Sequence, residues 1–189
     1  HSRLGIGHVR YSTTGSSNVV NAQPVVFYGR CGRMAVAHNG NIVNCDAIKS
    51  RLIRKGHIFQ SSIDSEVIAA LINLYADEGI EKGVMRACAE LVGAYALVVL
   101  ADDKLVAVRD PMGLKPLCVG TLGGDIVFAS ETCALDALGA TVIRDLSPGE
   151  VVTVDEGLDM KSEFLPEAHR RSCIFEYVYL ARSEERRVG

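Results

Sequence analysis

Three polar side chains stand at the ends of apolar runs, where side chains able to do chemistry are often held. The first is Arg10, which ends the segment Leu4–Arg10 and precedes the hydroxyl-rich stretch "YSTTG". A guanidinium at the end of a strand can donate two parallel hydrogen bonds to a carboxylate. The alternative is a structural arginine in a surface salt bridge. On the residues alone, Arg10 is a candidate for binding a carboxylate.

The pair Asn39–Gly40 follows the apolar run "MAVAH". Asn-Gly after such a run favours a two-residue hairpin, but the residues beyond it do not alternate. From Asn44 onward, apolar residues recur at a spacing typical of one helix face. The alternative is an oxyanion site, in which the Asn amide and the Gly backbone N–H both donate to a developing negative charge. Both interpretations stay open at this point.

Asp64 begins the pattern "DSEVIAALI", which predicts an amphipathic helix. The default interpretation is an N-cap, since Asp accepts hydrogen bonds from the first free N–H groups of a helix. A carboxylate in this place could also bind a ligand ammonium group. Cys173, in "RRSCIFEYVYLAR", reads most simply as a buried structural thiol.

The elements that must position these residues alternate between strands and helices. Turn signals such as "RDPMG", "LGGD" and "SPGE" separate them. Helices gather in the middle of the chain and strands dominate its second half, which predicts an α+β layered sandwich of antiparallel sheets with helices on the outer faces. We expect strands at Leu4–Arg10, Val25–Tyr28, Met34–His38, Ala94–Ala101, Leu105–Arg109, Pro116–Gly120, Asp125–Ser130 and Glu150–Asp155, and helices at Asn44–Lys55, Asp64–Tyr75, Ile80–Leu91 and Thr132–Leu138.

Length and charge exclude several classes of protein. The chain has 189 residues, enough for one substantial domain. A net charge of -3 gives no electrostatic support for nucleic-acid binding. The longest apolar run, Leu91 to Ala101, is too short to span a membrane, where about 20 residues are needed. The six cysteines contain no C-x-x-C pair, so we expect reduced thiols and a cytoplasmic protein.

Nine sequence blocks together resemble one family. In order they are "GHVRYSTTG", "NAQP", "AHNGNIVN", "DSEVIAALI", "GAYALVVL", "RDPMGLKPL", "ASETCALDALGA", "RDLSPGE" and "CIFEYVYLAR". The series resembles the glutaminase domain of the amidophosphoribosyltransferases, which belong to the N-terminal-nucleophile amidotransferases. The resemblance runs from about Leu4 to Arg182 and implies a four-layer α/β/β/α sandwich of antiparallel sheets, of the N-terminal-nucleophile hydrolase type.

The resemblance also implies a reaction. In that family an N-terminal cysteine attacks the side-chain amide of glutamine, with its own α-amino group as the base. Ammonia leaves, water releases glutamate, and the ammonia reaches a second domain that forms 5-phosphoribosylamine in the first step of purine synthesis. By matching position, the family's substrate-binding residues correspond to Arg10, Tyr11, Thr13 and Asp64, and its oxyanion pair corresponds to Asn39 and Gly40.

Cofactors and partners follow from the same resemblance. We expect glutamine and phosphoribosyl pyrophosphate as small-molecule substrates, no nucleic-acid or membrane partner, and a homo-oligomer in the full-length parent. Magnesium would serve the phosphoribosyltransferase domain. Cys173 matches a position that supplies one thiolate to a [4Fe–4S] cluster in an iron–sulfur subclass, and the other ligands would lie beyond this chain.

Two other functions remain in view. The glutaminase domain of the hexosamine-forming glutamine–fructose-6-phosphate aminotransferase shares the arginine block and the Asn-Gly pair. In that family, however, Trp follows the arginine and His stands four positions after it, where this chain has Tyr11 and Thr14. From a different class, the chain could be a non-catalytic amino-acid-binding module that kept the pocket without the nucleophile.

The limits of the domain generate the first prediction. We expect residues 1–181 to form a glutaminase domain without its N-terminal strand and nucleophile, and residues 182–189 to be a non-native, adaptor-like tail. Only a terminal cysteine has an adjacent α-amine, and this sequence begins at His1. The polypeptide should therefore show no glutaminase activity in an amidase assay, and measurable turnover of glutamine would contradict this expectation.

Overall fold

The apolar runs of the chain form strands that pair antiparallel into two sheets. The computed structural model describes residues 4–9, 19–30, 32–101 and 103–166. The larger sheet has six strands in the order β1-β2-β3-β4-β8-β9, and the smaller has three in the order β6-β5-β7. The strands are β1 (Val25–Gly29), β2 (Gly32–Ile42), β3 (Gly93–Ala101), β4 (Lys104–Arg109), β5 (Cys118–Leu122), β6 (Asp125–Ala129), β7 (Thr141–Asp145), β8 (Glu150–Asp155) and β9 (Met160–Phe164).

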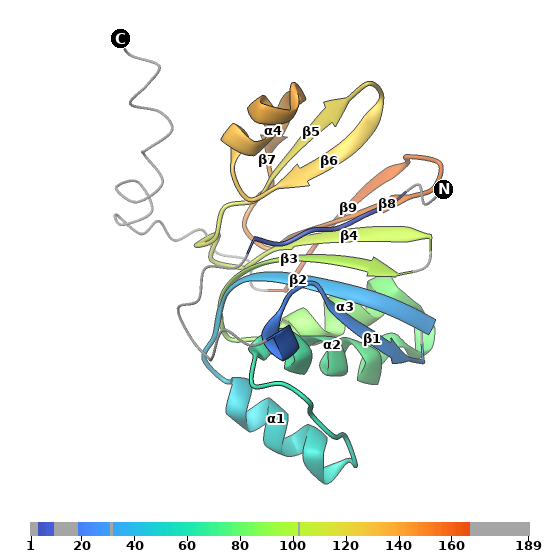
Figure 1. Cartoon of the computed structure of the whole chain (residues 1–189), viewed down its shortest axis with the longest axis vertical. Coiled ribbons are helices and arrows are strands. Elements are labelled where there is room, and N and C mark those ends of the chain that lie inside the picture. Colours follow the sequence, from blue (N-terminus) through green and yellow to red (C-terminus); the bar gives the residue numbers. More distant parts are fainter. Residues whose placement is uncertain (1–3, 10–18, 31, 102, 167–189) are drawn as a thin grey trace.

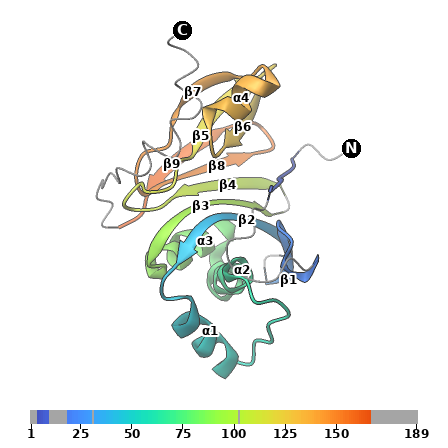
Figure 2. The ribbon, with the colours of Figure 1, turned by 60° about the vertical axis from the view of Figure 1, so that its left-hand side comes forward.

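Helices cover the outer faces of both sheets. Figure 1 shows α1, α2 and α3 on one side of the larger sheet and α4 on the far side of the smaller one, and Figure 2 shows the same order of layers from a second direction. The predicted four-layer α/β/β/α sandwich is therefore confirmed. The helices are α1 (Cys45–Arg54), α2 (Asp64–Tyr75), α3 (Ile80–Glu90) and α4 (Thr132–Leu138), with the short 3-10 turns η1 (Val19–Asn21) and η2 (Ala76–Glu78).

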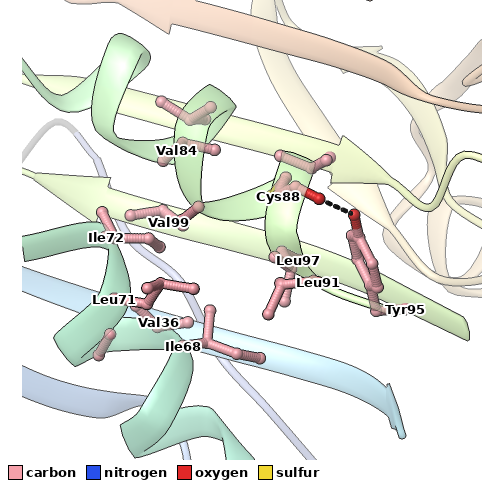
Figure 3. Packing of buried hydrophobic residues seen from close by; sticks show 14 of the residues in the cluster. Val36, Ile68, Leu71, Ile72, Val84, Cys88, Leu91, Tyr95, Leu97 and Val99 are labelled. Carbon is pink, nitrogen blue, oxygen red and sulfur yellow. Dashed lines mark hydrogen bonds between the residues drawn. The ribbon is translucent and has the colours of Figure 1, made fainter. Parts of the chain in front are cut away.

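β3 is apolar along its whole length because both of its faces are buried. Its alternate residues Tyr95, Leu97 and Val99 enter the core beneath the helices, as Figure 3 shows. Ala96 instead belongs to the core between the two sheets. A strand buried on both faces reads as a continuous apolar run rather than as an alternation. In the helix-side core, the hydroxyl of Tyr95 donates to the carbonyl of Cys88 at 3.2 Å, so its buried oxygen is satisfied.

Several expected boundaries differ from the observed ones. Residues 4–9 form no strand, although Leu4–Arg10 was expected to be one; the glycines at 5 and 7 weaken a strand there. β2 runs past His38 to Ile42, and β5 begins at Cys118 rather than Pro116. β7 and β9 were not expected. All five residues of β9 are exposed and show no apolar alternation.

Within the described residues, no helix is long and apolar enough to cross a bilayer.

The block "RDPMG" connects the larger sheet to the smaller one. Gly113 N–H donates to Asp110 O at 2.9 Å, which closes the predicted turn with Pro111 at its second position. The fully buried Asp110 carboxylate accepts from the backbone N–H groups that follow, those of Met112, Leu114 and Lys115. Asp110 N–H donates to Tyr95 O at 2.9 Å, so the turn is fixed to the end of β3.

A buried carboxylate joins the two sheets. Glu150, 2% exposed, begins β8 and accepts two hydrogen bonds from Arg144 of β7, at 2.7 and 2.6 Å. Its oxygens also accept from the Ser147 N–H and the Ser162 hydroxyl, each at 2.7 Å. Burial opposes ionisation, but these hydrogen bonds outweigh it and lower the pKa of Glu150 below 4.5.

Glu150→Gln should destabilise the fold, because it leaves the Arg144 guanidinium without its charged partner. We expect the free energy of unfolding in urea to fall by about 3 kcal/mol at pH 7. Because a depressed pKa stabilises the folded state only above the ordinary value, the difference from the unaltered protein should shrink as pH falls below 4.5. Glu163→Gln, on the exposed strand β9, is the control and should change stability by less than about 0.5 kcal/mol.

Candidate functional site

The site forms beside the part of β2 that lies beyond the first residue of β1 and so has no β1 partner. β1 begins at Val25, opposite Val36, so in the described part of the chain no strand pairs with β2 beyond that point on this side. Side chains replace the missing strand: His38 N–H donates to Gln23 Oε1 at 2.7 Å, and His8 Nε2 donates to His38 O at 3.1 Å. The blocks "GHVRYSTTG", "NAQP" and "AHNGNIVN" thus meet at one end of the sheet.

Gly40 presents its backbone to this open edge. The N–H and C=O groups of a strand point alternately to its two neighbours. His38 and Ile42 both use the open side, since Ile42 N–H donates to the Asp64 carboxylate, so Gly40 between them points the same way. On the other side, Gly40 lies opposite Tyr95, whose carbonyl faces the next strand and accepts from Asp110 N–H. Gly40 is exposed, and among the described residues its N–H has no partner, so this group is available to a ligand.

Gly40 is also the residue that the backbone geometry requires. Its φ is +152°, and a Cβ on it would lie 2.1 Å from Ala94 O and 2.8 Å from the Cα of Tyr95. Gly93, across the strand pair, has the same φ, and a Cβ there would meet Asn41 O at 2.2 Å. The two strands approach closely here because neither residue carries a side chain. The Asn-Gly pair is therefore no hairpin turn but a close approach inside a long strand.

Asp64 faces this same edge from the first turn of α2. The N-cap residue is Ile63, which makes no capping bond through its side chain, so the N-cap interpretation of Asp64 was wrong. Its carboxylate instead accepts from His38 Nδ1 at 3.2 Å and from the backbone N–H groups of Ile42 and Ser65. Burial disfavours the charged form, yet the hydrogen bonds from His38 and these N–H groups lower the pKa of Asp64 below 3.8. The group is an anion at neutral pH.

The loop before α2 is fastened so that Asp64 stays in place. The buried Glu66 carboxylate accepts from the backbone N–H groups of Gln60 and Ser61, at 2.9 and 2.7 Å, and from the Ser61 hydroxyl at 2.5 Å. Ser62 N–H and its hydroxyl approach the Oδ1 of the buried Asn21 at 3.4 Å each. The loop is thus joined both to its own helix and to the block "NAQP".

Asn39 is half-buried and pairs with Ala96 of β3. Strand alternation places its side chain on the opposite face of the sheet from His38. Among the described residues, no hydrogen bond is made by its side-chain amide. Within the part of the chain that the structure describes, both amide hydrogens of Asn39 are thus available to a ligand on that face.

Other expected site residues lie outside the described residues: Arg10, Tyr11, Thr13 and Cys173. Their roles stay predictions, as do the magnesium ion and the iron–sulfur cluster. Within the ranges that the structure describes, no group of three or more His, Cys, Asp and Glu side chains could hold a metal ion. The four described cysteines are free: Cys45, Cys88, Cys118 and Cys133.

Sequence reasoning missed the residues that hold the site together, namely His8, Gln23 and His38. His38 carried a usable signal, because it continues the alternation Met34, Val36 that faces the helices. A polar residue in that series predicts a buried partner. Gln23 and His8 gave no such signal, since their role depends on where β1 ends.

Comparisons with known proteins identify the family and the fold. The sequence profile of a family described as "Glutamine amidotransferase domain" matches residues 8–137. An amidophosphoribosyltransferase of Archaeoglobus fulgidus is 44% identical over 182 residues, which cover 95% of this chain and 40% of the relative. The chloroplastic amidophosphoribosyltransferase 1 of Arabidopsis thaliana is 45% identical over 179 residues, which cover 94% of this chain and 32% of the relative.

A solved structure shares the fold. The glutamine phosphoribosylpyrophosphate amidotransferase of Bacillus subtilis, complexed with ADP and GMP, matches with a TM-score of 0.84 at 38% identity. The match covers 93% of this chain and 38% of that chain. The chain thus spans about two fifths or less of the length of these relatives. The fold expected from the family resemblance is confirmed.

Gly40→Ala should separate the two strands at the site. A methyl group at 2.1 Å from Ala94 O cannot fit, so we expect the free energy of unfolding to fall by about 3 kcal/mol. Gly56→Ala is the matched control, because Gly56 also has a positive φ, +89°, but open space around it. It should cost about 1 kcal/mol, the strain of the left-handed conformation alone. If the two variants lose the same free energy of unfolding in urea, the close approach of the strands at Gly40 does not contribute to stability.

Proposed function

The chain belongs to the family of glutamine amidotransferase domains, and we propose that it is the glutaminase part of an amidophosphoribosyltransferase. The proposal that the parent is an amidophosphoribosyltransferase is supported by the two relatives of that name, at 44% and 45% identity. The parent protein would then use the released ammonia to convert phosphoribosyl pyrophosphate to 5-phosphoribosylamine. The observation that carries the proposal is that the Asp64 anion contacts Ile42 N–H on the same sheet edge as the Gly40 N–H, which has no partner among the described residues.

The spacing of the donors along β2 matches the length of a free glutamine molecule. The N–H groups of Gly40 and Ile42 lie about 7 Å apart along the strand, and Ile42 N–H donates to Asp64. Extended glutamine separates its ammonium group from its side-chain carbonyl oxygen by a similar length. We assign Asp64 to the ammonium group and Gly40 N–H to the carbonyl oxygen. Arg10 is assigned to the α-carboxylate, which its fork of donors can bind in two places.

In the proposed reaction, a thiolate attacks the carboxamide carbon and the C=O electrons move onto oxygen. Gly40 N–H and the Asn39 amide donate to this oxyanion, and one such donor is typically worth about 3 kcal/mol of transition-state stabilisation. The C–N bond then breaks as the nitrogen receives the proton taken from the thiol, and ammonia leaves. Water hydrolyses the thioester to glutamate and regenerates the thiol.

The described cysteines are unsuited to the role of nucleophile. Burial raises the pKa of Cys45 and Cys118 to about 11 and that of Cys88 to about 12, so these thiols stay protonated at neutral pH. The hydrogen bond to Glu131 raises the pKa of Cys133. We therefore assign the attack to a terminal cysteine of the parent protein, whose own α-amine can accept the proton.

Glutamine binding tests the proposal directly. We expect calorimetric titration of this chain with glutamine to show a single weak site. Asp64→Asn should reduce the affinity about tenfold, since it removes the charge that faces the ammonium group. Asp125→Asn, exposed on β6, is the matched control and should bind as the unaltered chain does. No glutamine binding by the unaltered chain, or equal binding by Asp64→Asn, would contradict the assignment.

A further inference from the structure

His38 is a buried polar residue that the reaction does not use. Its side chain is 1% exposed, and its Nδ1 lies 3.2 Å from Asp64 Oδ1. A carboxylate anion only accepts hydrogen bonds, so Nδ1 carries the proton and donates. Within the described residues, the other ring nitrogen, Nε2, is buried and has no hydrogen-bond partner. The ring therefore makes one polar contact, and that contact is with Asp64.

This arrangement is costly for a residue that only fills the core. Two other positions of β2 on the same face, Val36 and Ile42, are apolar and buried. An apolar side chain at position 38 would fill the same space without a buried nitrogen that has no partner among the described residues, an arrangement that destabilises a fold. The backbone of His38 is held independently of its ring, through Gln23 Oε1 and His8 Nε2. A structural role for the strand thus needs no imidazole.

The Asp64 carboxylate gains an orientation from this contact. Asp64 is 25% exposed, so one side of the group remains open to a ligand. Two backbone N–H groups, those of Ile42 and Ser65, and the ring of His38 contact it from the protein side. A carboxylate held by several donors loses less rotational freedom when a ligand arrives.

We propose that His38 is a positioning residue that directs the Asp64 carboxylate toward the amine of the substrate and so makes the site select free α-amino acids. The inference rests on the proposed function, since it refines how the same site recognises glutamine. His38 touches no substrate atom in this role. It acts only through Asp64. Removing its ring should therefore weaken the binding of the ligand's ammonium group more than the binding of its other groups.

The probe for this role is a pair of ligands, glutamine and glutaramate, the analogue of glutamine without the α-amino group. Calorimetry or NMR titration of the 189-residue chain gives the ratio of their dissociation constants. We expect a preference for glutamine of at least about tenfold in the unaltered chain. His38→Leu, similar in size but without a donor, should lower this preference about tenfold, mainly by weakening glutamine binding.

Two further variants keep the test decisive if His38→Leu does not fold. His38→Asn places an amide N–H near the position of Nδ1 and should retain the preference, whereas His38→Gln extends its amide toward the position of Nε2 and should lose it. His57→Leu is the matched control: this half-buried histidine stacks with Phe27 at 5.6 Å between ring centroids and also has a buried, unpartnered Nε2. It should leave the preference unchanged.

The outcomes separate the two proposals. If the unaltered chain binds neither ligand, the proposed function fails, and this inference falls with it. If the unaltered chain prefers glutamine and the leucine and glutamine variants at position 38 keep that preference, only the role of His38 is overturned. A uniform loss of affinity for both ligands would likewise overturn it, because that is the mark of a purely structural residue.

Discussion

The site depends on the length of β1, which starts only at Val25, opposite Val36, and leaves the rest of β2 without a partner strand on that side among the residues that the structure describes. A strand inside a sheet has its N–H and C=O groups paired on both sides, and buried groups of this kind are rarely left unpaired. β2 extends beyond β1, so its last residues need other partners on that side. His38 finds them in Gln23 and His8, and Ile42 finds one in Asp64. Within the described ranges, Gly40 between them has no such partner and can face a ligand.

Rigid packing on the remaining sides makes this edge a fixed platform. β3 is buried on both faces, by the helices on one side and by the second sheet on the other. Gly40 and Gly93 let β2 and β3 approach so closely that no side chain fits between them. The turn that begins at Asp110 closes the end of β3 through Tyr95. Donors on such a framework keep their direction before any ligand arrives, which is the condition for stabilising a developing charge.

The sequence predicted the layers well and the site in part. Two helices, Asp64–Tyr75 and Thr132–Leu138, have the predicted bounds because their apolar spacing and flanking turn residues agree. β9 was missed because all five of its residues are exposed, so its sequence shows no apolar alternation. For Asn39, Gly40 and Asp64, the residues alone left a structural and a functional interpretation open, and the family resemblance favoured the functional one. The contacts of Gln23 and His8 depend on a strand boundary, which a sequence pattern places only within a few residues.

The electrostatics of Asp64 explain why a cation, and not merely a polar group, suits this edge. Burial disfavours the charge of Asp64, and the donors from His38, Ile42 and Ser65 more than compensate for it, so the carboxylate stays ionised well below neutral pH. These three donors contact the carboxylate from the protein side, and the group is 25% exposed on the side that a ligand can reach. An ammonium group that binds there meets an anion already formed, and no proton has to be moved first. A neutral ligand of the same shape would have to displace water from that anion without replacing the lost interaction, which penalises binding.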